Sequence, residues 1–457
     1  MYRKEDIESI AINLDNIKDE AEYECRTKND PTLDEMSNVY GDIMDYLRTN
    51  NIIAYGGFAQ NLLIGAKDKA KEFYKRIGKA LFNWPKIADI EFYSPTPVKN
   101  VIELTELLRK KNHPYIASEG GVHEGTYKIF VNFENYCDIS YMPTIVFNSI
   151  PTITIDGIKC ASPYFMGVDA FRVMTDPMTS YWRLDKSINR FQTLFELYKL
   201  KDMIQIDNFD KTNLKKIFGK VDENAIKFIR KSIVHKSKLI VVGTHGYDYY
   251  MGKIKGEKIG DIAPYYLISI NLDKDFEKIS KILKDKYPNK ITIKSYHPYY
   301  EFIDKRHEFY LDGVQILKLY GNNNRCIVFY QSEKKYTKFG TFNLITMYNL
   351  FEYFNSITHN KDMVGYYGKF INNFMDIRSQ WLTEYNKTVT DKSIFQDFTF
   401  KCIGESFNPI RESRLEMIKK KKEGKRFKFR YEPSGKPLER LPEFSYPNTS
   451  GNEIKKN

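Results

Sequence analysis

The sequence predicts an α+β fold of two mixed-sheet domains, with helical segments before, between and after them. A buried strand enters a Gly-Gly turn and a helix near residue 55, and further strands and helices follow to about residue 180. The same order of elements begins again near residue 239, which indicates a repeat. A chain of 457 residues is long enough for several such domains.

The first predicted element is a helix from about Pro31 to Leu47. Thr32 and Glu35 form a capping box at its start, and apolar residues then recur at helical spacing until Asn50. Five further elements are predicted before residue 110: a buried strand at 52–55 that enters Gly56-Gly57, the helix that follows this turn, a helix at 68–80, a strand at 87–93, and a helix at 98–108.

Two strands, at 127–133 and 136–142, are predicted next, with a polar turn at Glu134-Asn135 between them. Residues 181–233 are charged and helical in pattern. The repeat then supplies its own elements: strands at 239–242 and 266–271, a helix around 276–283, and strands at 310–311 and 314–320, followed by helices at 343–354 and 364–385.

These elements predict six segments: an N-terminal helical segment (1–50), a first mixed domain (51–180), a helical segment (181–235), a second mixed domain (236–335), C-terminal helices (336–410) and a basic tail (411–457). The tail is rich in lysine, with aromatic residues interleaved between Lys425 and Tyr431. Polar residues, Gly and Pro dominate after Glu432, which predicts disorder. Such a tail either binds RNA or is a solvated, localising segment.

The composition limits which partners and which metal sites are expected. Lys and Arg number 71 against 59 Asp and Glu, so the net charge of +12 favours a polyanionic partner, although an AT-rich coding sequence would also enrich lysine. The five cysteines stand far apart without a CxxC pair, which predicts reduced thiols and no zinc. No apolar run is long enough to span a bilayer, and the charged residues 1–34 do not read as a secretory signal.

Three carboxylates are the candidate catalytic and metal-ligating residues. Asp89 and Glu91 fall on one face of a predicted strand, because successive side chains of a strand point to opposite sides. Asp138 falls on another half-buried strand, and the three converge if these strands are neighbours. Like charges so close raise one another's pKa, and a divalent cation relieves the repulsion. Two Mg²⁺ ions held in this way would activate a hydroxyl nucleophile and stabilise the leaving oxygen of a phosphoryl displacement.

Gly56-Gly57, at a junction between a strand and a helix, is a candidate phosphate-binding turn. Without side chains the backbone can approach a phosphate closely, and the following helix offers free N–H groups.

In this order, Gly56-Gly57, Asp89-Ile90-Glu91 and Asp138 resemble the signature of the polymerase-β-like nucleotidyltransferases. Within that superfamily the chain is most similar to the poly(A) polymerase catalytic subunits of nucleocytoplasmic large DNA viruses, of the poxvirus and giant-virus type. Three stretches support this resemblance, which is clearest over residues 35–200: Gly56 to Leu63, Asp89 to Ser94, and Asp176 to Arg190. Glu91 stands where many members have Asp.

The resemblance implies specific roles. Asp89, Glu91 and Asp138 would bind two Mg²⁺ or Mn²⁺ ions, and Gly56-Gly57 would lie at the triphosphate of the substrate ATP. Lys186 and Arg190, one helical turn apart, would be further triphosphate contacts. The implied partners are an RNA 3′ end and either a separate processivity subunit or a second copy of the chain, with no membrane. The implied location is cytoplasmic, in a viral factory or a virion.

The second mixed domain would be a degenerate nucleotidyltransferase domain. Spacing alone lays Ser269, Asn271 and approximately Gln315 over the three carboxylates, and none of these residues can neutralise two dications. The resemblance also implies a non-catalytic repeat.

The resemblance therefore implies a template-independent polymerase that adds a poly(A) tail to mRNA from ATP. The residues alone leave other functions open. Another terminal RNA nucleotidyltransferase (U-adding, CCA-adding or an oligoadenylate synthase) would use the same carboxylates. A non-catalytic RNA-binding scaffold would not need them.

Overall fold

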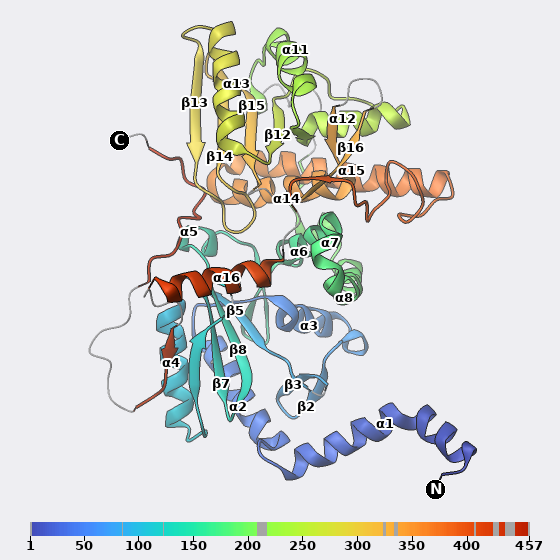
Figure 1. The fold of residues 1–457 in the computed structure, drawn as a ribbon, viewed down its shortest axis with the longest axis vertical. Coiled ribbons are helices and arrows are strands. Elements are labelled where there is room, and N and C mark those ends of the chain that lie inside the picture. Colours follow the sequence, from blue (N-terminus) through green and yellow to red (C-terminus); the bar gives the residue numbers. More distant parts are fainter. Residues whose placement is uncertain are drawn as a thin grey trace. The chain divides into compact units, whose positions relative to one another are not determined.

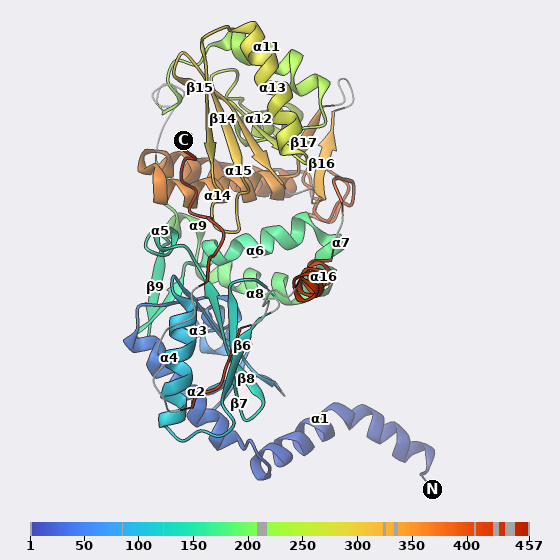
Figure 2. The ribbon, with the colours of Figure 1, turned by 60° about the vertical axis from the view of Figure 1, so that its left-hand side comes forward.

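The computed structural model describes residues 2–84, 86–121, 123–207, 217–322, 326–332, 337–405, 408–423, 429–434 and 444–455 (Figures 1 and 2). The chain divides into two compact units. Unit 1 consists of Met1–Met142, Thr152–Ala161 and Ile410–Tyr446, and unit 2 of Pro143–Pro151, Ser162–Pro409 and Pro447–Asn457. The six segment boundaries predicted from the sequence stay a prediction about independent folding.

Unit 1 begins with two helices. α1 (Lys4–Lys28) has no buried residue and projects from the rest of the unit in both views (Figures 1 and 2). α2 (Leu33–Thr49) confirms the first predicted helix: Thr32 and Glu35 form the expected capping box, and Asn50 ends the helix.

The main sheet of unit 1 has the strand order β19-β6-β7-β8-β5-β1-β10-β9. Its strands are β1 (Ile53–Ala54), β5 (Ile90–Ser94), β6 (Ala117–Gly120), β7 (Thr126–Val131), β8 (Glu134–Tyr141), β9 (Thr152–Ile155), β10 (Ile158–Ala161) and β19 (Arg430–Tyr431). α3 (Gly56–Lys67) follows β1 directly, as the Gly-Gly pattern predicts. α4 (Pro97–Lys110) confirms the predicted helix and buries Val101, Thr105 and Leu108.

Two predictions for residues 68–93 are wrong. In place of a helix at 68–80, the 3₁₀ turn Lys69–Lys71 leads into a small sheet of β2 (Lys75–Ile77), β3 (Ala80–Asn83) and β4 (Lys86–Ile87). Gly78, with a φ of 57°, makes the tight turn between β2 and β3 that a helix would not permit. The predicted strand at 87–93 is split, because β4 pairs with β3 whereas β5 pairs with β1 and β8.

The predicted turn at Glu134-Asn135 is also displaced. The β7–β8 hairpin turns at Asn132 and Phe133, both of which have positive φ, and Asn135 lies within β8. The Asn135 side chain therefore projects from strand β8 of the sheet and not from a loop.

Unit 2 has a main sheet of strand order β13-β14-β15-β12-β11-β17-β16-β18. Its strands are β11 (Ile240–Val242), β12 (Tyr265–Ser269), β13 (Ile291–Tyr296), β14 (Arg306–Leu311), β15 (Val314–Gly321), β16 (Ile327–Gln331), β17 (Lys338–Gly340) and β18 (Cys402–Ile403). α12 (Gly243–Ile254) and α13 (Leu272–Lys286) follow β11 and β12 and confirm the predicted repeat.

The described helices of unit 2 outside this repeat are α5 (Thr144–Phe147), α6 (Pro163–Thr175), α7 (Pro177–Ser180), α8 (Leu184–Leu197), α9 (Leu200–Met203), α11 (Glu223–Ser232), α14 (Phe342–His359) and α15 (Val364–Glu384), with short 3₁₀ turns between some of them. Of these helices, α8, α9 and α11 fall in the predicted helical segment at 181–233, and α14 and α15 match the two predicted C-terminal helices, whereas α5, α6 and α7 were not predicted. Part of the predicted helical segment at 181–233, residues 208–216, lies outside the described residues. No helix in the described ranges is long and apolar enough to cross a membrane.

The two main sheets share one topology over seven strands. The orders β6-β7-β8-β5-β1-β10-β9 and β13-β14-β15-β12-β11-β17-β16 match strand for strand, including the parallel pairs β5–β8 and β12–β15. Even the register shift in β7–β8, between Ile129 and Phe130, recurs in β14–β15 between Phe309 and Tyr310. The prediction of an α+β chain with two related mixed-sheet domains is confirmed.

The C-terminal region is not disordered where the structure describes it. α16 (Pro409–Lys422) is followed by β19, which pairs with β6. Tyr446 stacks on Tyr141 with 4.0 Å between ring centroids, and Ser450 and Glu453 form bridges with the chain around β13. Phe429 is buried and Tyr446 is stacked, so aromatic side chains give this region apolar contacts. The prediction of disorder from composition did not take these contacts into account. The predicted basic–aromatic run at 425–428 lies outside the described residues.

The prediction of reduced thiols is wrong for one pair of cysteines. Cys326 and Cys402 form a disulfide, because β18 pairs with β16 and brings these residues together across a sequence separation of 76. Cys25, Cys137 and Cys160 are free thiols.

Candidate active site

The register of the unit 1 sheet gathers the three predicted carboxylates. Glu91 on β5 is the direct partner of Asp138 on the parallel strand β8, so both side chains leave the same face of the sheet. Asp89 lies just before β5, two residues from Glu91, and is half-buried. The sequence placed all three on strands, whereas Asp89 lies in the short connection from β4.

Asn135 bridges two members of this carboxylate trio (Asp89, Glu91 and Asp138). Its Nδ2 donates to Asp89 Oδ1 at 3.0 Å and to Asp138 Oδ1 at 3.2 Å, so both oxygens lie within hydrogen-bonding reach of one nitrogen. The Asn135 Oδ1 atom is buried and has no hydrogen-bond partner in the described chain. The side-chain amide therefore fixes how close the Asp89 and Asp138 carboxylates lie.

Lys128 neutralises the third carboxylate. It lies opposite Asp138 in the antiparallel β7–β8 pairing, and its Nζ is 2.6 Å from both Asp138 oxygens. The Lys128 and Asp138 side chains are 27% and 19% exposed, so this ion pair borders solvent.

The second carboxylate caps the helix that follows the Gly-Gly turn. Glu91 Oε2 accepts a hydrogen bond from the Gly57 N–H at 2.7 Å, at the first turn of α3. Gly56 has a φ of 63°, and a Cβ at this position would lie 2.1 Å from Glu91 Oε2. Glycine is therefore required here both by its backbone conformation and by the carboxylate beside it.

The site holds more negative charge than it neutralises. Burial raises the pKa of the Glu91 carboxyl, and the neighbouring Asp138 and Asp89 carboxylates raise it further, to about 7. This shift persists although the Gly57 and Phe58 N–H groups favour the ionised form and Lys128 lies nearby. One ammonium therefore leaves the trio short of positive charge.

In the conformation described, no group of three His, Cys, Asp or Glu side chains among the described residues is arranged to hold a metal ion. Within the trio, the Asp138 carboxylate accepts a hydrogen bond from Lys128, and the Glu91 carboxylate accepts one from the first turn of α3. The donor set nevertheless fits a hard dication, which prefers carboxylate and carbonyl oxygens. The raised pKa of Glu91 reflects repulsion among these carboxylates as well as burial, and a bound dication would relieve that repulsion.

The corresponding site of unit 2 is found from the strand register. Ala54, two residues before Gly56, pairs with Phe92, and Val241, two residues before Gly243, pairs with Leu267. Tyr266 therefore corresponds to Glu91. The register of β12–β15 then makes Lys318 the counterpart of Asp138, since Tyr266 pairs with Lys318 as Glu91 pairs with Asp138.

The prediction that Ser269, Asn271 and Gln315 replace the trio is therefore wrong. The replacements are Pro264, Tyr266 and Lys318. The alignment by element order and spacing failed because the additional sheet β2-β3-β4 lengthens the connection between α3 and β5 in unit 1.

The true counterparts of the misassigned residues follow from the same register. Ser269 corresponds to Ser94, and the hydroxyl of each accepts a hydrogen bond from a backbone N–H two residues later. Gln315 corresponds to Asn135, since it pairs with Tyr310 as Asn135 pairs with Phe130.

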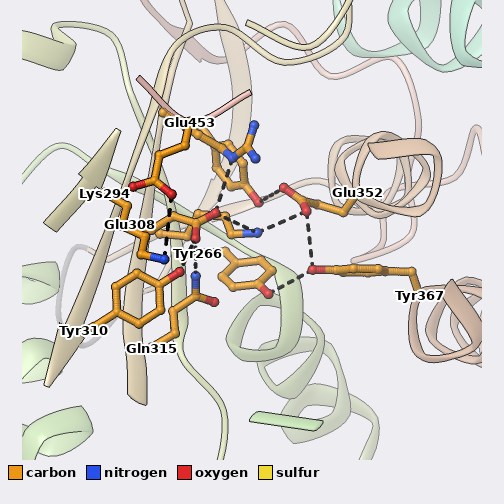
Figure 3. A network of polar contacts seen from close by, with 11 residues as sticks. Tyr266, Lys294, Glu308, Tyr310, Gln315, Glu352, Tyr367 and Glu453 are labelled. Carbon is orange, nitrogen blue, oxygen red and sulfur yellow. Dashed lines mark hydrogen bonds and ion pairs between the residues drawn. The ribbon is translucent and has the colours of Figure 1, made fainter. Parts of the chain in front are cut away.

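Unit 2 fills its site with a buried ionic network (Figure 3). Lys318 Nζ is 3.0 Å from Glu352 and 3.5 Å from Glu308, and all three side chains are at most 7% exposed. Burial alone would raise the pKa of Glu308, but Lys318 and Arg306 lower it to about 2. Hydroxyl and amide groups complete the network: Tyr310 and Gln315 donate to Glu308, Tyr320 and Tyr367 donate to Glu352, and Tyr266 bonds Tyr367.

The other predicted site residues, Lys186 and Arg190, lie on α8 in unit 2. They are one turn apart, Lys186 exposed and Arg190 half-buried. Their predicted contact with a triphosphate stays a proposal.

Lys128 and Asn135 were missed by sequence reasoning. A signal for Lys128 was present, because a residue facing Asp138 across a hairpin must share its face of the sheet. The misplaced turn and the register shift between Ile129 and Phe130 hid that signal. Asn135 could not be recognised while it was assigned to a turn.

Comparison with known proteins identifies the family. Residues 201–457 match the family model described as "APMV, Putative poly(A) polymerase, catalytic subunit, C-terminal", and residues 41–180 match "Poly(A) polymerase catalytic subunit". The chain is 28% identical to the putative poly(A) polymerase catalytic subunit of Acanthamoeba polyphaga mimivirus, over 99% of this chain and 83% of that protein. It is 22% identical to the corresponding protein of African swine fever virus (strain Badajoz 1971 Vero-adapted), over 35% of this chain and 32% of that protein.

A solved structure agrees over the whole length. The crystal structure of the Megavirus polyadenylate synthase matches with a TM-score of 0.86 and 28% identity, covering all of this chain and 93% of that one. The family match over more than half of the sequence and the fold agree. The chain belongs to the family of poly(A) polymerase catalytic subunits of nucleocytoplasmic large DNA viruses.

Proposed function

We propose that the chain extends RNA 3′ ends with adenylate from ATP without a template, and that Asp89, Glu91 and Asp138 hold two divalent cations, Mg²⁺ or Mn²⁺, for this reaction. The observation that supports the site assignment is the β5–β8 register, which projects Glu91 and Asp138 from one face beside Asp89. The family supports the reaction type and the nucleotide.

The reaction forms one bond and breaks one. The 3′ oxygen of the RNA forms a bond to the α-phosphorus of ATP, the bond from that phosphorus to the bridging oxygen breaks, and pyrophosphate leaves. The cations, when bound, activate the hydroxyl and neutralise the charge on the leaving oxygen. Most of the rate enhancement in such a reaction comes from positioning and charge neutralisation.

The residues of the chain contribute positioning. Asn135 donates hydrogen bonds to both the Asp89 and the Asp138 carboxylates, and so keeps these two carboxylates close to each other. Gly56 gives Glu91 the space to reach the first turn of α3. A triphosphate at this turn would meet the N–H groups of α3 beside the Glu91 carboxylate, or in its place. Lys186 and Arg190 are proposed as additional contacts to the triphosphate.

Partners and location follow from the relatives. The matched viral proteins are described as catalytic subunits, which supports a separate processivity subunit, and a second copy of this chain is the alternative partner. We place the activity in the cytoplasmic factory or the virion of a large DNA virus, because the relatives come from mimivirus and African swine fever virus.

A primer-extension assay tests this function. Purified protein is incubated with Mg²⁺, a short RNA primer and one of the four ribonucleoside triphosphates at a time. Extension with ATP alone is expected. Extension with UTP or CTP instead would reassign the chain to another terminal transferase, and no extension with any nucleotide, under conditions in which the protein binds RNA, would favour a scaffold.

A further inference from the structure

The shortest hydrogen bonds described in the candidate active site come from a residue to which the proposed reaction assigns no role. Lys128 Nζ lies 2.6 Å from Oδ1 and 2.6 Å from Oδ2 of Asp138. An ammonium equidistant from both oxygens occupies the position that a cation bound by both oxygens of that carboxylate would take.

A dication and this ammonium compete for Asp138. Both are attracted by the same two oxygens, and they repel each other at the separations that simultaneous binding would impose. Asn135, the other described side chain bonded to Asp138, is neutral and donates to Oδ1 alone. Lys128 is therefore the group that a metal ion has to displace or turn aside.

Unit 2 shows a permanent form of the same cross-strand pair. Glu308 and Lys318 occupy the register positions of Lys128 and Asp138 with the charges exchanged. There the pair is sealed, with both side chains 7% exposed and Lys318 also bound to Glu352. In unit 1 the pair is 27% and 19% exposed and Lys128 has no second carboxylate among the described ion pairs, so its ammonium can leave.

We propose that Lys128 is a placeholder cation, which neutralises Asp138 in the metal-free enzyme and is displaced when a divalent cation binds. Lys128 thereby lowers the metal affinity of the trio and stabilises the metal-free fold. It is a positioning residue that acts through Asp138, and this role rests on the proposed function of the trio as metal ligands.

Metal binding by variants tests the proposal without any turnover. Mn²⁺ binding is measured by electron paramagnetic resonance or calorimetry for the wild type, Lys128→Met and Lys128→Arg. Lys128→Met should bind Mn²⁺ roughly tenfold more tightly or better, because the competing charge is gone, while its metal-free melting temperature falls. Lys128→Arg keeps the charge and should stay near the wild-type affinity. Unchanged or weaker binding by Lys128→Met would overturn the proposal.

Two controls separate this proposal from the assignment of the metal site. Lys159→Met removes one charge from β10 of the same sheet, where the ammonium bonds only Asn51 among the contacts described, and should leave Mn²⁺ affinity unchanged. Asp138→Asn should lose the Mn²⁺ affinity of the wild type. If the wild type and Asp138→Asn bind equally weakly, the metal assignment and the placeholder role both fail. If the wild type binds and Lys128→Met does not bind more tightly, only the placeholder role fails.

A measurement on the wild-type protein covers the case in which Lys128→Met does not fold. Lysines are labelled by reductive methylation with and without Mg²⁺, and the extent at each position is read by mass spectrometry. Displacement from Asp138 should raise the labelling of Lys128 several-fold on addition of Mg²⁺, with Lys159 unchanged. Labelling of Lys128 that stays equal or falls with Mg²⁺ would contradict the displacement.

Discussion

Units 1 and 2 share one strand topology but balance the charges of their buried carboxylates in opposite ways. Unit 1 keeps three carboxylates with one partly exposed lysine, and the pKa of Glu91 is raised to about 7. Unit 2 puts a lysine at the position of the third carboxylate and surrounds it with two buried glutamates, and the pKa of Glu308 is lowered to about 2. The carboxylates of the first site outnumber the single lysine paired with them, whereas the lysine of the second site is shared by two buried glutamates.

In unit 2 a buried structural network stands at the position of the carboxylate trio of unit 1. Tyr266 fills the space of Glu91, and a Cβ on Gly243 would lie 2.7 Å from its ring, just as one on Gly56 would strike Glu91. Lys318 lies 4.8 Å from the centre of the Tyr266 ring, so its ammonium is stabilised by the aromatic face as well as by carboxylates. Substitutions at matched positions should therefore impair catalysis in unit 1 and folding in unit 2.

The largest effect is expected in unit 1. Asp89→Asn keeps the shape of the side chain and its place beside Asn135 but removes a ligand charge, so primer extension should fall by roughly 10³-fold or more. The melting temperature should change little, or rise in the absence of metal. If this variant extends primers at nearly the wild-type rate, Asp89 is not a catalytic residue.

The matched change in unit 2 should act on stability. Lys318→Met leaves Glu308 and Glu352 buried without their shared cation, which is expected to cost about 3–5 kcal/mol in the free energy of unfolding. Chemical denaturation measures this loss, and extension per folded molecule should remain close to that of the wild type. A stable but inactive variant would instead give Lys318 a role in the reaction.

The pH dependence of stability should differ in sign between the two units. Glu91 has a pKa near 7 in the folded protein and 4.5 as its ordinary value, so its contribution to stability is present below pH 4.5 and is lost as the pH rises through 7. Metal-free Glu91→Gln should therefore gain stability over the wild type, up to about 3 kcal/mol, between pH 4.5 and 8.

Glu308 gives the opposite profile. Its pKa near 2 in the folded protein means that its contribution is present above pH 4.5 and is lost as the pH falls towards 2. Glu308→Gln should be less stable than the wild type at pH 6, and the difference should shrink below pH 4.5. Urea denaturation at fixed pH values, without metal, tests both variants, and parallel profiles for the two would contradict the comparison.

The smallest effects are expected at the paired glycines. Gly56→Ala and Gly243→Ala both place a Cβ at a positive φ, which costs about 1–2 kcal/mol of stability in each before the contact with Glu91 or with the Tyr266 ring is relieved. Gly56→Ala must also push the Glu91 carboxylate aside, so it alone should lower primer extension. If the two variants extend primers equally well, the glycine at position 56 is not needed for the role of Glu91 in the reaction.

Much of this arrangement could be predicted from local patterns. The capping box of Thr32 and Glu35, the Gly-Gly helix start and the strand carboxylates each depend on a few neighbouring residues, and the first two are confirmed. The register of the repeat could not be predicted, because it depends on which strands pair. The additional sheet β2-β3-β4 lengthens the interval between Gly56 and Asp89, on which the alignment to Ser269 relied.

The groups that complete the sites were missed because they also depend on which residues pair across strands. Lys128 and Asn135 become neighbours of Asp138 only through the β7–β8 pairing and its register shift. The disulfide between Cys326 and Cys402 and the pairing of Glu453 near Tyr296 are likewise contacts across long separations. Periodicity and charge describe single elements and say nothing of such contacts.

Anomalous diffraction from crystals of the full chain soaked in Mn²⁺ tests the contrast between the two units most directly. Manganese peaks are expected beside Asp89, Glu91 and Asp138, with Lys128 turned away from Asp138, and no peak is expected beside Tyr266 and Lys318. An empty trio at saturating Mn²⁺, or a peak within the Lys318 network, would contradict the account.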